Sequence, residues 1–449
     1  MTPSIPMQAP AYAPREPAAT AAWLARAHAT LLTAFLFYTF VGTQPFADTS
    51  AGGRVDGNVL DRIVVMAMFA LALAMLAATW RGALAAVRGN FGLLALVGFS
   101  LVSILWSDYP SLTLRRGLLF VFLTTIAMAI AVTLRDLRRF HSFLFAFLTG
   151  VVLVNLAGVV VAPALTITDI GVKGIYTQKN VAGIVAMITI MVGVTWMLGV
   201  HRKRATLIGL AALVPAIVFL IITRSKTSIN ITALGVLIVM FFAAAERLGA
   251  WFILVAGCIG LLALAGLLAL LAAVDFDVNV LISAVVGDTT FTGRDELWAF
   301  ARREAQKRLW LGHGYGAFWD VGVANDPLGR VETGSWLASV PVGTINQAHH
   351  GFLELWLHIG LPATIFAVAL IVKAALTGGW RAVLGGGGDA TRALLACLAV
   401  LLVLHLLHNF TEATLFMRGA AFCNVITLAL FILSRARDFT PPAPVARPS

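Results

Sequence analysis

Long apolar runs, separated by short polar connections, limit what this chain can fold into more than any other feature of its sequence. Hydrophobic residues make up 60% of the 449 residues and charged residues only 12%, and the mean hydropathy of +0.91 lies far outside the range of soluble globular domains. A membrane-spanning helix needs about 20 mostly apolar residues, so the sequence predicts an all-α integral membrane protein with about 12 transmembrane helices. The expected spans are residues 27–43, 62–80, 91–106, 117–133, 142–162, 182–200, 205–222, 228–245, 250–273, 351–376, 391–410 and 414–434.

Basic residues lie singly and in small groups between the apolar runs. The formal net charge is +11, but this scattered pattern favours a topological explanation over nucleic-acid binding. With a cytoplasmic N-terminus, the inner connections are much more basic than the outer ones. The sequence therefore predicts that both termini are cytoplasmic and that nucleic acid is not a partner. The inner basic groups are Arg81 and Arg88; Arg135, Arg138 and Arg139; Arg202, Lys203 and Arg204; and Arg435 and Arg437.

This topology divides the chain into tails, spans and one long outer loop. The first 20 residues are rich in Pro and Ala and lack the hydrophobic core of a cleavable signal peptide. The three cysteines lie in apolar runs without CxxC spacing, so neither a disulfide framework nor a zinc site is expected. The expected parts are a disordered cytoplasmic tail (1–26), spans one to nine (27–273), a periplasmic loop with short helices (274–350), spans ten to twelve (351–434) and a cytoplasmic tail (435–449).

The outer segment 274–350 breaks the rhythm of spans and short connections, and it is too long for a simple turn. An amphipathic helix is predicted from about Asp295 to Lys307, with Thr292-Gly293 as its capping region. A glycine-rich turn, Gly312-His313-Gly314-Tyr315-Gly316, follows it. We expect this segment to form a small cap over the outer face of the helix bundle.

Two histidines mark the junction where this loop enters the tenth apolar run. His349 and His350 are followed by Glu354, which is at i+4 from His350 if a helix has begun. An imidazole at such a place can take a proton from a sugar hydroxyl, which is the work of a general base. The plain alternative is a pair of interfacial histidines. His358, His405 and His408 lie deeper in apolar runs and are expected to serve packing or hydrogen bonding.

Several cations lie on the outer side, where the topology does not account for them. Arg224 and Lys226 occupy a very tight connection between two spans, so both must lie at the membrane boundary. A guanidinium fork matches two phosphate oxygens and keeps its charge when desolvated, so phosphate binding would explain them. The alternative is that they are interfacial anchors whose heads reach lipid phosphates. The same two explanations apply to Arg115, Arg116, Lys173 and Lys179.

Arg294 and Glu412 add one charge of each sign on the outer side. Arg294 begins the predicted cap helix, and a helix N-terminus with an added arginine is a good anion site. The alternative is an ordinary helix start, because the neighbouring Asp295 and Glu296 are common residues of a first helical turn. Glu412 lies just beyond the eleventh run, where a carboxylate is costly unless it is paired. One of the outer arginines is the obvious candidate partner.

No metal-ligand spacing, phosphate-binding P-loop or DxD-like carboxylate pair occurs in the sequence. The sequence therefore predicts no metal and no cofactor, and it does not support a cytosolic sugar-nucleotide donor. Outer arginines without a metal site suit a donor whose leaving group is a lipid pyrophosphate.

These residues resemble the O-antigen ligase and O-antigen polymerase superfamily, including its exopolysaccharide-polymerase branch. The family's C-terminal region has a His, a polar residue, nine others and then Gly, and here His349 and His350 are followed by nine residues and Gly360. His350 stands where Asn or Ser is more usual. The likeness covers roughly residues 110–420, with further elements in the family's order. These are Gln178-Lys179-Asn180, Arg224-Ser225-Lys226-Thr227, Gly293-Arg294 through Trp298, and Gly312 through Gly316.

The resemblance implies a metal-independent, inverting glycosyltransferase with a bundle of the GT-C type. Carried over by motif, Arg224 and Arg294, together with Lys226, would hold the pyrophosphate of an undecaprenyl-linked glycan. His349 would activate the acceptor hydroxyl of lipid A core or of a growing polysaccharide. His350, Glu354, Lys179, Arg116 and Glu412 are expected to support the site, and which histidine is the base stays open. Membrane lipids of the bacterial inner membrane complete the expected partners.

Two alternatives remain at this point. Ligation and polymerisation cannot be separated by motif, although Gln178-Lys179-Asn180 and the 223–228 stretch look slightly more like the exopolysaccharide-polymerase branch. A transporter or flippase of lipid-linked oligosaccharide would share the spans and the basic residues. It would favour inverted repeats and a polar path through the bundle. No obvious repeat or mid-span charge series is present, so glycan transfer is favoured.

Overall fold

The fold is described by a computed structural model of the chain. It describes residues 18–42, 58–200, 202–248, scattered residues between 251 and 266, 294–331, 334–384 and 388–439. The expected tails at 1–17 and 440–449 and most of the ninth expected span lie outside the described residues. The same holds for the first part of the outer loop, with Thr292-Gly293.

Helices dominate the described residues, as the apolar runs predict. Eight helices are long and apolar enough to cross a membrane, or nine if the pair α4 (Trp80–Gly89) and α5 (Phe91–Val102), bent by 83°, is one span together with η2 (Ser103–Leu105). The eight are α3 (Val59–Ala78), α6 (Pro110–Thr133), α7 (Leu137–Val161), α9 (Lys179–Gly199), α10 (Lys203–Thr223), α11 (Lys226–Leu248), α16 (Leu361–Leu384) and α17 (Asp389–His408).

The predicted number of about twelve spans is therefore not matched in the described part of the chain. The helix α1 (Ala18–Phe40) covers the first expected span but is not among the candidates, because Arg26 and His28 interrupt its apolar run. The twelfth expected span begins late. Its helix α18 (Ala421–Ser434) has only 14 residues, because residues 409–420 form a non-helical connection; the short α19 (Ala436–Phe439) follows it.

The tenth expected span, residues 351–376, was wrong as a single helix. The chain breaks at Gly360, so α15 (Gly351–Ile359) is separate from α16. Gly360 has φ +83°, and a Cβ there would lie 2.1 Å from the carbonyl oxygen of Trp310. Apolarity alone cannot reveal this break, because α15 is itself apolar; its buried face packs against the helix of residues 294–307.

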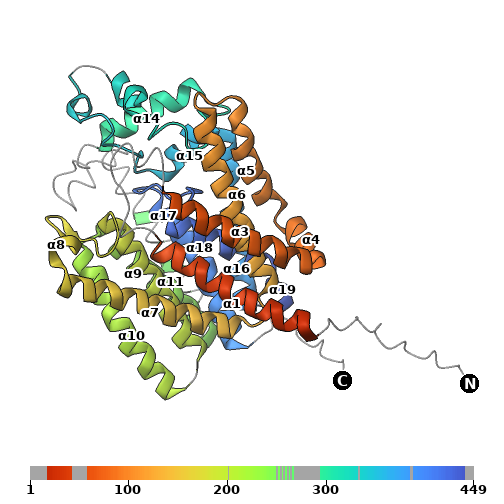
Figure 1. The fold of residues 1–449 in the computed structure, drawn as a ribbon. Coiled ribbons are helices and arrows are strands. Elements are labelled where there is room, and N and C mark those ends of the chain that lie inside the picture. The colour runs from red at the N-terminus through yellow and green to blue at the C-terminus, as the bar shows by residue number, and fades with distance from the viewer. Residues whose placement is uncertain are drawn as a thin grey trace, which may run out of the picture.

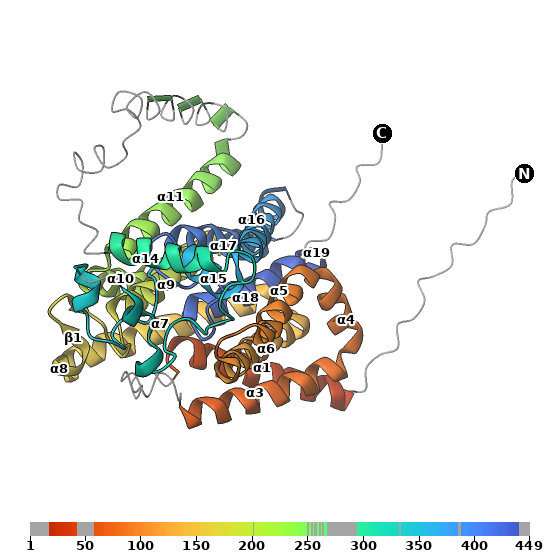
Figure 2. The same ribbon diagram turned by 90° about the horizontal axis from the view of Figure 1, so that it is seen from above.

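The bundle places its most buried spans at the centre. The spans α6, α9 and α17 bury most of their residues, whereas α3, α10, α11 and α16 each bury about a quarter of theirs. Outward-facing residues such as Leu207, Val214 and Ile221 are apolar, as expected for helices that face lipid. Figures 1 and 2 show α17 and α18 in the middle of the bundle; α18 lies against α1 and α6, and α17 lies against α9, α11 and α16.

A short hairpin joins α7 to α9. After α8 (Pro163–Thr166), the strands β1 (Ile167–Thr168) and β2 (Gly171–Val172) pair antiparallel, with Ile167 opposite Val172. Gly171 has φ +143°, and a Cβ at this position would lie 2.3 Å from the carbonyl oxygen of Thr223. This glycine therefore lets the hairpin lie directly against the end of α10.

The described part of the outer loop forms a cap at one end of the bundle (Figure 1). Its main helix, α14 (Arg294–Lys307), confirms the amphipathic helix predicted from Asp295 to Lys307. Leu297, Phe300 and Ala301 of α14 pack with Leu353 and Leu357 of α15 in a second core. The cap also contains the 3-10 turns η3 (Val323–Asn325), η4 (Pro327–Arg330) and η5 (Trp336–Ser339).

Arginines fasten the cap to the bundle. The guanidinium of Arg116, buried in α6, donates to the carbonyl oxygens of Gly316, Trp319 (3.0 Å) and Asp320 (2.9 Å). Arg308 donates to the carbonyl of Trp106 (3.1 Å) and to the carboxylate of Asp108 (2.6 Å). The cap is thus held by the buried hydrogen bonds of Arg116 and by the more exposed ones of Arg308, as well as by its apolar core.

Candidate functional site

The loop before α15 holds His349 in an unusual backbone conformation. His349 has φ +50°, in the left-handed region that side chains other than glycine rarely adopt. Its neighbour Ala348 is fixed on both sides, because its N–H donates to Glu354 Oε2 (2.7 Å) and its carbonyl accepts from Trp298 Nε1 (3.0 Å). Strain of this kind is found preferentially where a side chain must be aimed.

The carboxylate of Glu412 lies at the centre of the site. Its Oε2 is 3.4 Å from His349 Nδ1, and its Oε1 is 3.4 Å from Arg294 Nη2. Oε1 also accepts a 2.5 Å hydrogen bond from Asn180 Nδ2 at the start of α9. One buried carboxylate therefore joins the His349 loop, the first residue of the cap helix and the bundle.

Charge keeps Glu412 ionised. Burial alone would raise the pKa of this carboxyl, but its hydrogen bond to His349 and the positive charges nearby outweigh that effect and hold the pKa below its ordinary 4.5. Arg294 is tied to the same connection a second time, because Nη1 donates to the carbonyl of Thr411 (2.6 Å). The expected pairing of Glu412 with an outer arginine is thus present, and the arginine is Arg294.

The geometry leaves His349 one nitrogen for chemistry. Nδ1 faces Glu412 Oε2, and the amide nitrogen of Gln347 also lies 3.4 Å from Nδ1. The amide nitrogen can only donate, so the two contacts favour different tautomers, and the ionised carboxylate, as the stronger acceptor, favours a proton on Nδ1. Nε2 has no hydrogen-bond partner among the described residues, and the side chain is 26% exposed. With its Nδ1–H directed at a carboxylate, a neutral imidazole carries its lone pair on Nε2, where it can accept a proton.

His350 is engaged differently. Its Nδ1 accepts the backbone N–H of Leu353 (3.3 Å), which makes it the N-cap of α15. Burial lowers the pKa of His350 and favours its neutral form, whose proton must then be on Nε2. The rings of Trp298, Phe352 and Phe410 surround it. Since the lone pair of Nδ1 is used by the helix, His350 is poorly placed to act as a base.

We therefore expect His350→Asn to keep the stability of the wild type, because asparagine is an equally good N-cap acceptor. His350→Ala should lose about 1 kcal/mol of stability with the cap. The melting temperatures of the two purified variants test this. Equal melting temperatures for His350→Ala and the wild type would show that the cap contributes no stability.

A second group of cations lies where α10 ends and α11 begins. Arg224 has φ +51° and ends α10 in the left-handed conformation, and Lys226 starts α11. The side chains of both are exposed, and neither makes a hydrogen bond or ion pair with the described part of the chain. Lys179 Nζ donates to the carbonyl of Ile170 (2.9 Å) and approaches that of Arg224 (3.5 Å).

Polar side chains connect these cations to Glu412. Ser225 Oγ donates to Asn180 Oδ1 (3.2 Å), and Asn180 in turn donates to Glu412. The hydroxyls of Thr227 and Thr411 are 3.1 Å apart. The 224–228 turn, the start of α9 and the 409–420 connection are thus one hydrogen-bonded unit.

Two expected supporting residues lie outside this network. The guanidinium of Arg116 is committed to cap carbonyls, so it has a role that neither phosphate binding nor lipid anchoring describes. Glu354 points into the cap, where it accepts from Trp319 Nε1 (3.0 Å) and faces His358 Nε2 at 3.2 Å. It acts on His349 only through Ala348.

Sequence reasoning did not single out the amides and hydroxyls that complete the network. Asn180, Ser225 and Thr411 are ordinary polar residues at helix ends. The Gln178-Lys179-Asn180 and Arg224-Ser225-Lys226-Thr227 elements contain the first two, but gave neither of them a role. Thr411 adjoins the one acidic residue of its connection, which is the only local signal that it carries.

The fold and the network define a multi-pass membrane protein with a polar, cationic site at one end of an apolar helix bundle. The family described as O-antigen ligase matches residues 210–368, roughly a third of the chain, which include Arg224, Arg294 and His349. This match supports the resemblance of the chain to the O-antigen ligase and polymerase superfamily. A comparison with curated proteins found no match.

Proposed function

We propose that this protein transfers a glycan from an undecaprenyl-pyrophosphate carrier to a sugar hydroxyl at the periplasmic face of the bacterial inner membrane. Both termini would be cytoplasmic, and the bundle would be of the GT-C type. The observation that carries the proposal is the carboxylate of Glu412. It lies between an imidazole with an open Nε2 and an arginine at a helix N-terminus. A base and an anion-binding group are thereby brought to one place.

The reaction is a single displacement that inverts the sugar carbon. His349 Nε2 takes the proton of the acceptor hydroxyl as its oxygen bonds to the anomeric carbon. The bond from that carbon to the pyrophosphate oxygen breaks, and its electron pair leaves with the lipid pyrophosphate. Cations at Arg224, Lys226 and Arg294 stabilise the charge that grows on the leaving group. Protons and charge balance without a metal or a cofactor.

The surroundings of Arg224 suit a lipid-linked donor. Ile221 on α10 and Ile170 in the hairpin are 59% and 64% exposed, and Val160 and Val161 at the end of α7 are more than 80% exposed. Apolar surface beside exposed cations fits a ligand with a charged pyrophosphate and a polyprenyl tail. Glu412, ionised and near Arg294, limits the net positive charge so that the product pyrophosphate can leave.

The test is conversion by the purified protein. In detergent with a lipid-linked oligosaccharide donor, a sugar acceptor and no energy source, we expect glycan transfer and release of undecaprenyl pyrophosphate. Chromatography of the lipid fraction with mass spectrometry of the glycan measures both products. Transport of the donor across liposome membranes without any transfer would favour the transporter or flippase explanation.

The acceptor separates two versions of this function. A ligase would attach the glycan to lipid A core, and a polymerase would extend a growing polysaccharide. In a deletion strain, loss of long chains with single repeats still attached indicates a polymerase. Loss of all attachment to lipid A indicates a ligase.

A further inference from the structure

A second site lies at the other end of the bundle. The helices α9, α11, α16 and α17 enclose a cavity of about 630 Å³, within the size range of small-ligand sites. The cavity is lined by the C-terminal ends of α9, α11 and α16 and the N-terminal half of α17. At the opposite ends of these helices lie residues of the His349 site: Asn180 at the start of α9, Lys226 at the start of α11 and Glu412 just after α17. The part of the cavity at Asp389, the first residue of α17, is therefore separated from the His349 site by about the length of α17, roughly 30 Å at 1.5 Å per residue.

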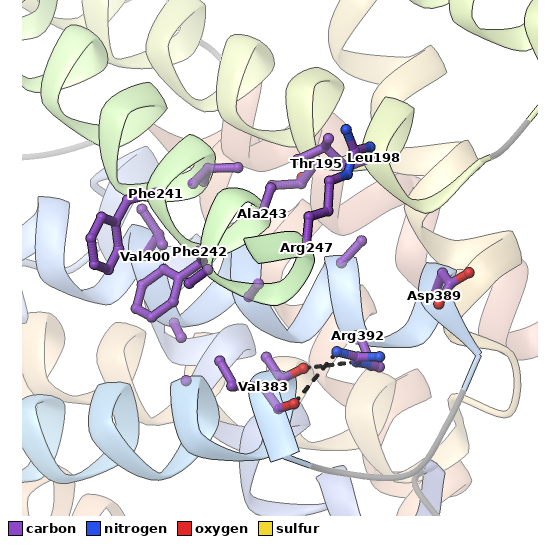
Figure 3. A pocket seen from close by; sticks show the side chains of 17 residues that line it. Thr195, Leu198, Phe241, Phe242, Ala243, Arg247, Val383, Asp389, Arg392 and Val400 are labelled. Carbon is purple, nitrogen blue, oxygen red and sulfur yellow. Dashed lines mark hydrogen bonds between the residues drawn. The ribbon is translucent and has the colours of Figure 1, made fainter. Parts of the chain in front are cut away.

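The cavity has an apolar end and a charged end. Figure 3 shows Phe241, Phe242 and Val400 at one end and Arg247, Asp389 and Arg392 at the other. Along α17, Arg392 and Val400 are eight residues apart, so the cavity extends roughly 12 Å along that helix. Small side chains, among them Ala396, leave the space between the ends. A ligand that fills it must be amphipathic and elongated.

The charged end favours an anion. Arg392 is held in place, because Nε donates to the carbonyl of Ala382 (3.0 Å) and Nη2 to that of Val383 (3.4 Å), as Figure 3 shows. Arg247 reaches the cavity from α11 and is exposed. Asp389 is the acidic residue of the lining, so two cations outnumber one carboxylate there.

Further cations surround this end. Gly199, the last residue of α9, packs against Ala390 at the start of α17, so the connection after α9 lies beside the mouth of the cavity. Arg202 in that connection, and Lys203 and Arg204 at the start of α10, are exposed. Basic pockets between transmembrane helices on the cytoplasmic side are recognition sites for anionic lipid headgroups.

We infer that this cavity binds an anionic phospholipid, with its phosphate at Arg247 and Arg392 and an acyl chain against Phe241 and Phe242. The lipid comes from the leaflet remote from His349, which is the cytoplasmic leaflet in the orientation proposed above. Glycan chemistry takes place at the other end, so the bound lipid is a structural ligand and not the glycan donor.

Native mass spectrometry of the full-length protein tests the inference. We expect phosphatidylglycerol to be retained about fivefold more strongly than phosphatidylcholine, which is the effect of roughly one added basic contact. Arg247→Gln should remove that preference and leave a weak binding common to both lipids. Ala396→Phe should fill the cavity and lower the retention of both. The control is Arg138→Gln, which removes an exposed cation near the start of α7 that does not line the cavity.

Several outcomes would overturn the inference. Equal retention of both lipids by the wild type, or equal losses in Arg247→Gln and Arg138→Gln, would exclude a specific headgroup site. Displacement of phosphatidylglycerol by equimolar undecaprenyl phosphate would assign the cavity to the carrier lipid. Melting temperatures show whether Ala396→Phe is folded, and Arg247→Gln tests the site if it is not. Binding needs no catalysis, so a His349→Gln protein should retain phosphatidylglycerol like the wild type.

Discussion

Replacing His349 by glutamine is expected to lower the rate of glycan transfer by about 10²–10⁴-fold, the usual contribution of a general base. Glutamine keeps the polarity and nearly the size of the side chain but cannot accept a proton at neutral pH. His349 is the imidazole of the site with an open Nε2, and its Nδ1 faces a carboxylate. The measurement is the initial rate of transfer by purified protein with saturating lipid-linked donor.

The matched control is His350→Asn in the same preparation and assay. The two histidines are adjacent, but His350 Nδ1 is used as the cap of α15, whereas His349 Nε2 is not used by the protein. We expect the control to transfer glycan at a rate near that of the wild type. A His349→Gln protein that is folded and fully active would remove His349 from the mechanism.

Replacing Glu412 by glutamine should lower the transfer rate at least about tenfold. A buried carboxylate that holds the imidazole in its correct tautomer is worth up to ~10⁴ in a serine protease triad. Here the longer 3.4 Å separation indicates a smaller effect. Glutamine can still pair with Asn180, but it cannot accept from His349 and Arg294 as an anion. Glu412→Asp, which keeps the charge, should recover part of the rate.

The stability of the same variant should depend on pH. Because the pKa of Glu412 is held below 4.5, the ionised carboxylate stabilises the folded protein at every pH above that value. This contribution is lost as the pH falls through the lower pKa of the folded state. Wild type should therefore melt at a higher temperature than Glu412→Gln near neutral pH, and the difference should shrink once the pH falls below 4.5.

Asp169→Asn is the control for the loss of one carboxylate, because Asp169 is exposed in the β1–β2 turn at the same end of the molecule. It should change neither the rate nor the pH dependence of melting. If Glu412→Gln behaved like this control in both measurements, the carboxylate would have no positioning role.

Local patterns were sufficient for the class of the protein and for much of its helical content. Lipid supplies no partner for backbone N–H and C=O groups, so a membrane span is an apolar helix whose hydrogen bonds lie within the segment. Such a helix appears in the sequence as a run of consecutive apolar residues. The amphipathic pattern from Asp295 to Lys307 likewise predicted α14 nearly to the residue. The spacing from His349 to Gly360 indicated the family that the match at residues 210–368 supports.

The same local reasoning failed where a distant contact decides the structure. The apolar run at 351–376 reads as one span, but Gly360 passes within contact distance of the Trp310 carbonyl and ends α15 there. From its position in the sequence, Arg116 is interpreted as a ligand for phosphate or lipid. The carbonyl oxygens that it binds lie 200 to 204 residues further along the chain. Neither partner can be read from neighbouring residues.

The sequence by itself determined an α-helical membrane protein and the cap helix α14, and it pointed to the residues proposed as the base and the anion-binding groups. Only the tertiary structure decided how those groups meet. Glu412 lies 63 residues from His349, 118 from Arg294 and 232 from Asn180, yet one carboxylate contacts all three. A long apolar run in the sequence indicates a helix that can lie in lipid, because that preference depends on the residues of the run itself. Which polar groups pair depends on the packing of α9, α14, α15 and α17, a property of the whole bundle.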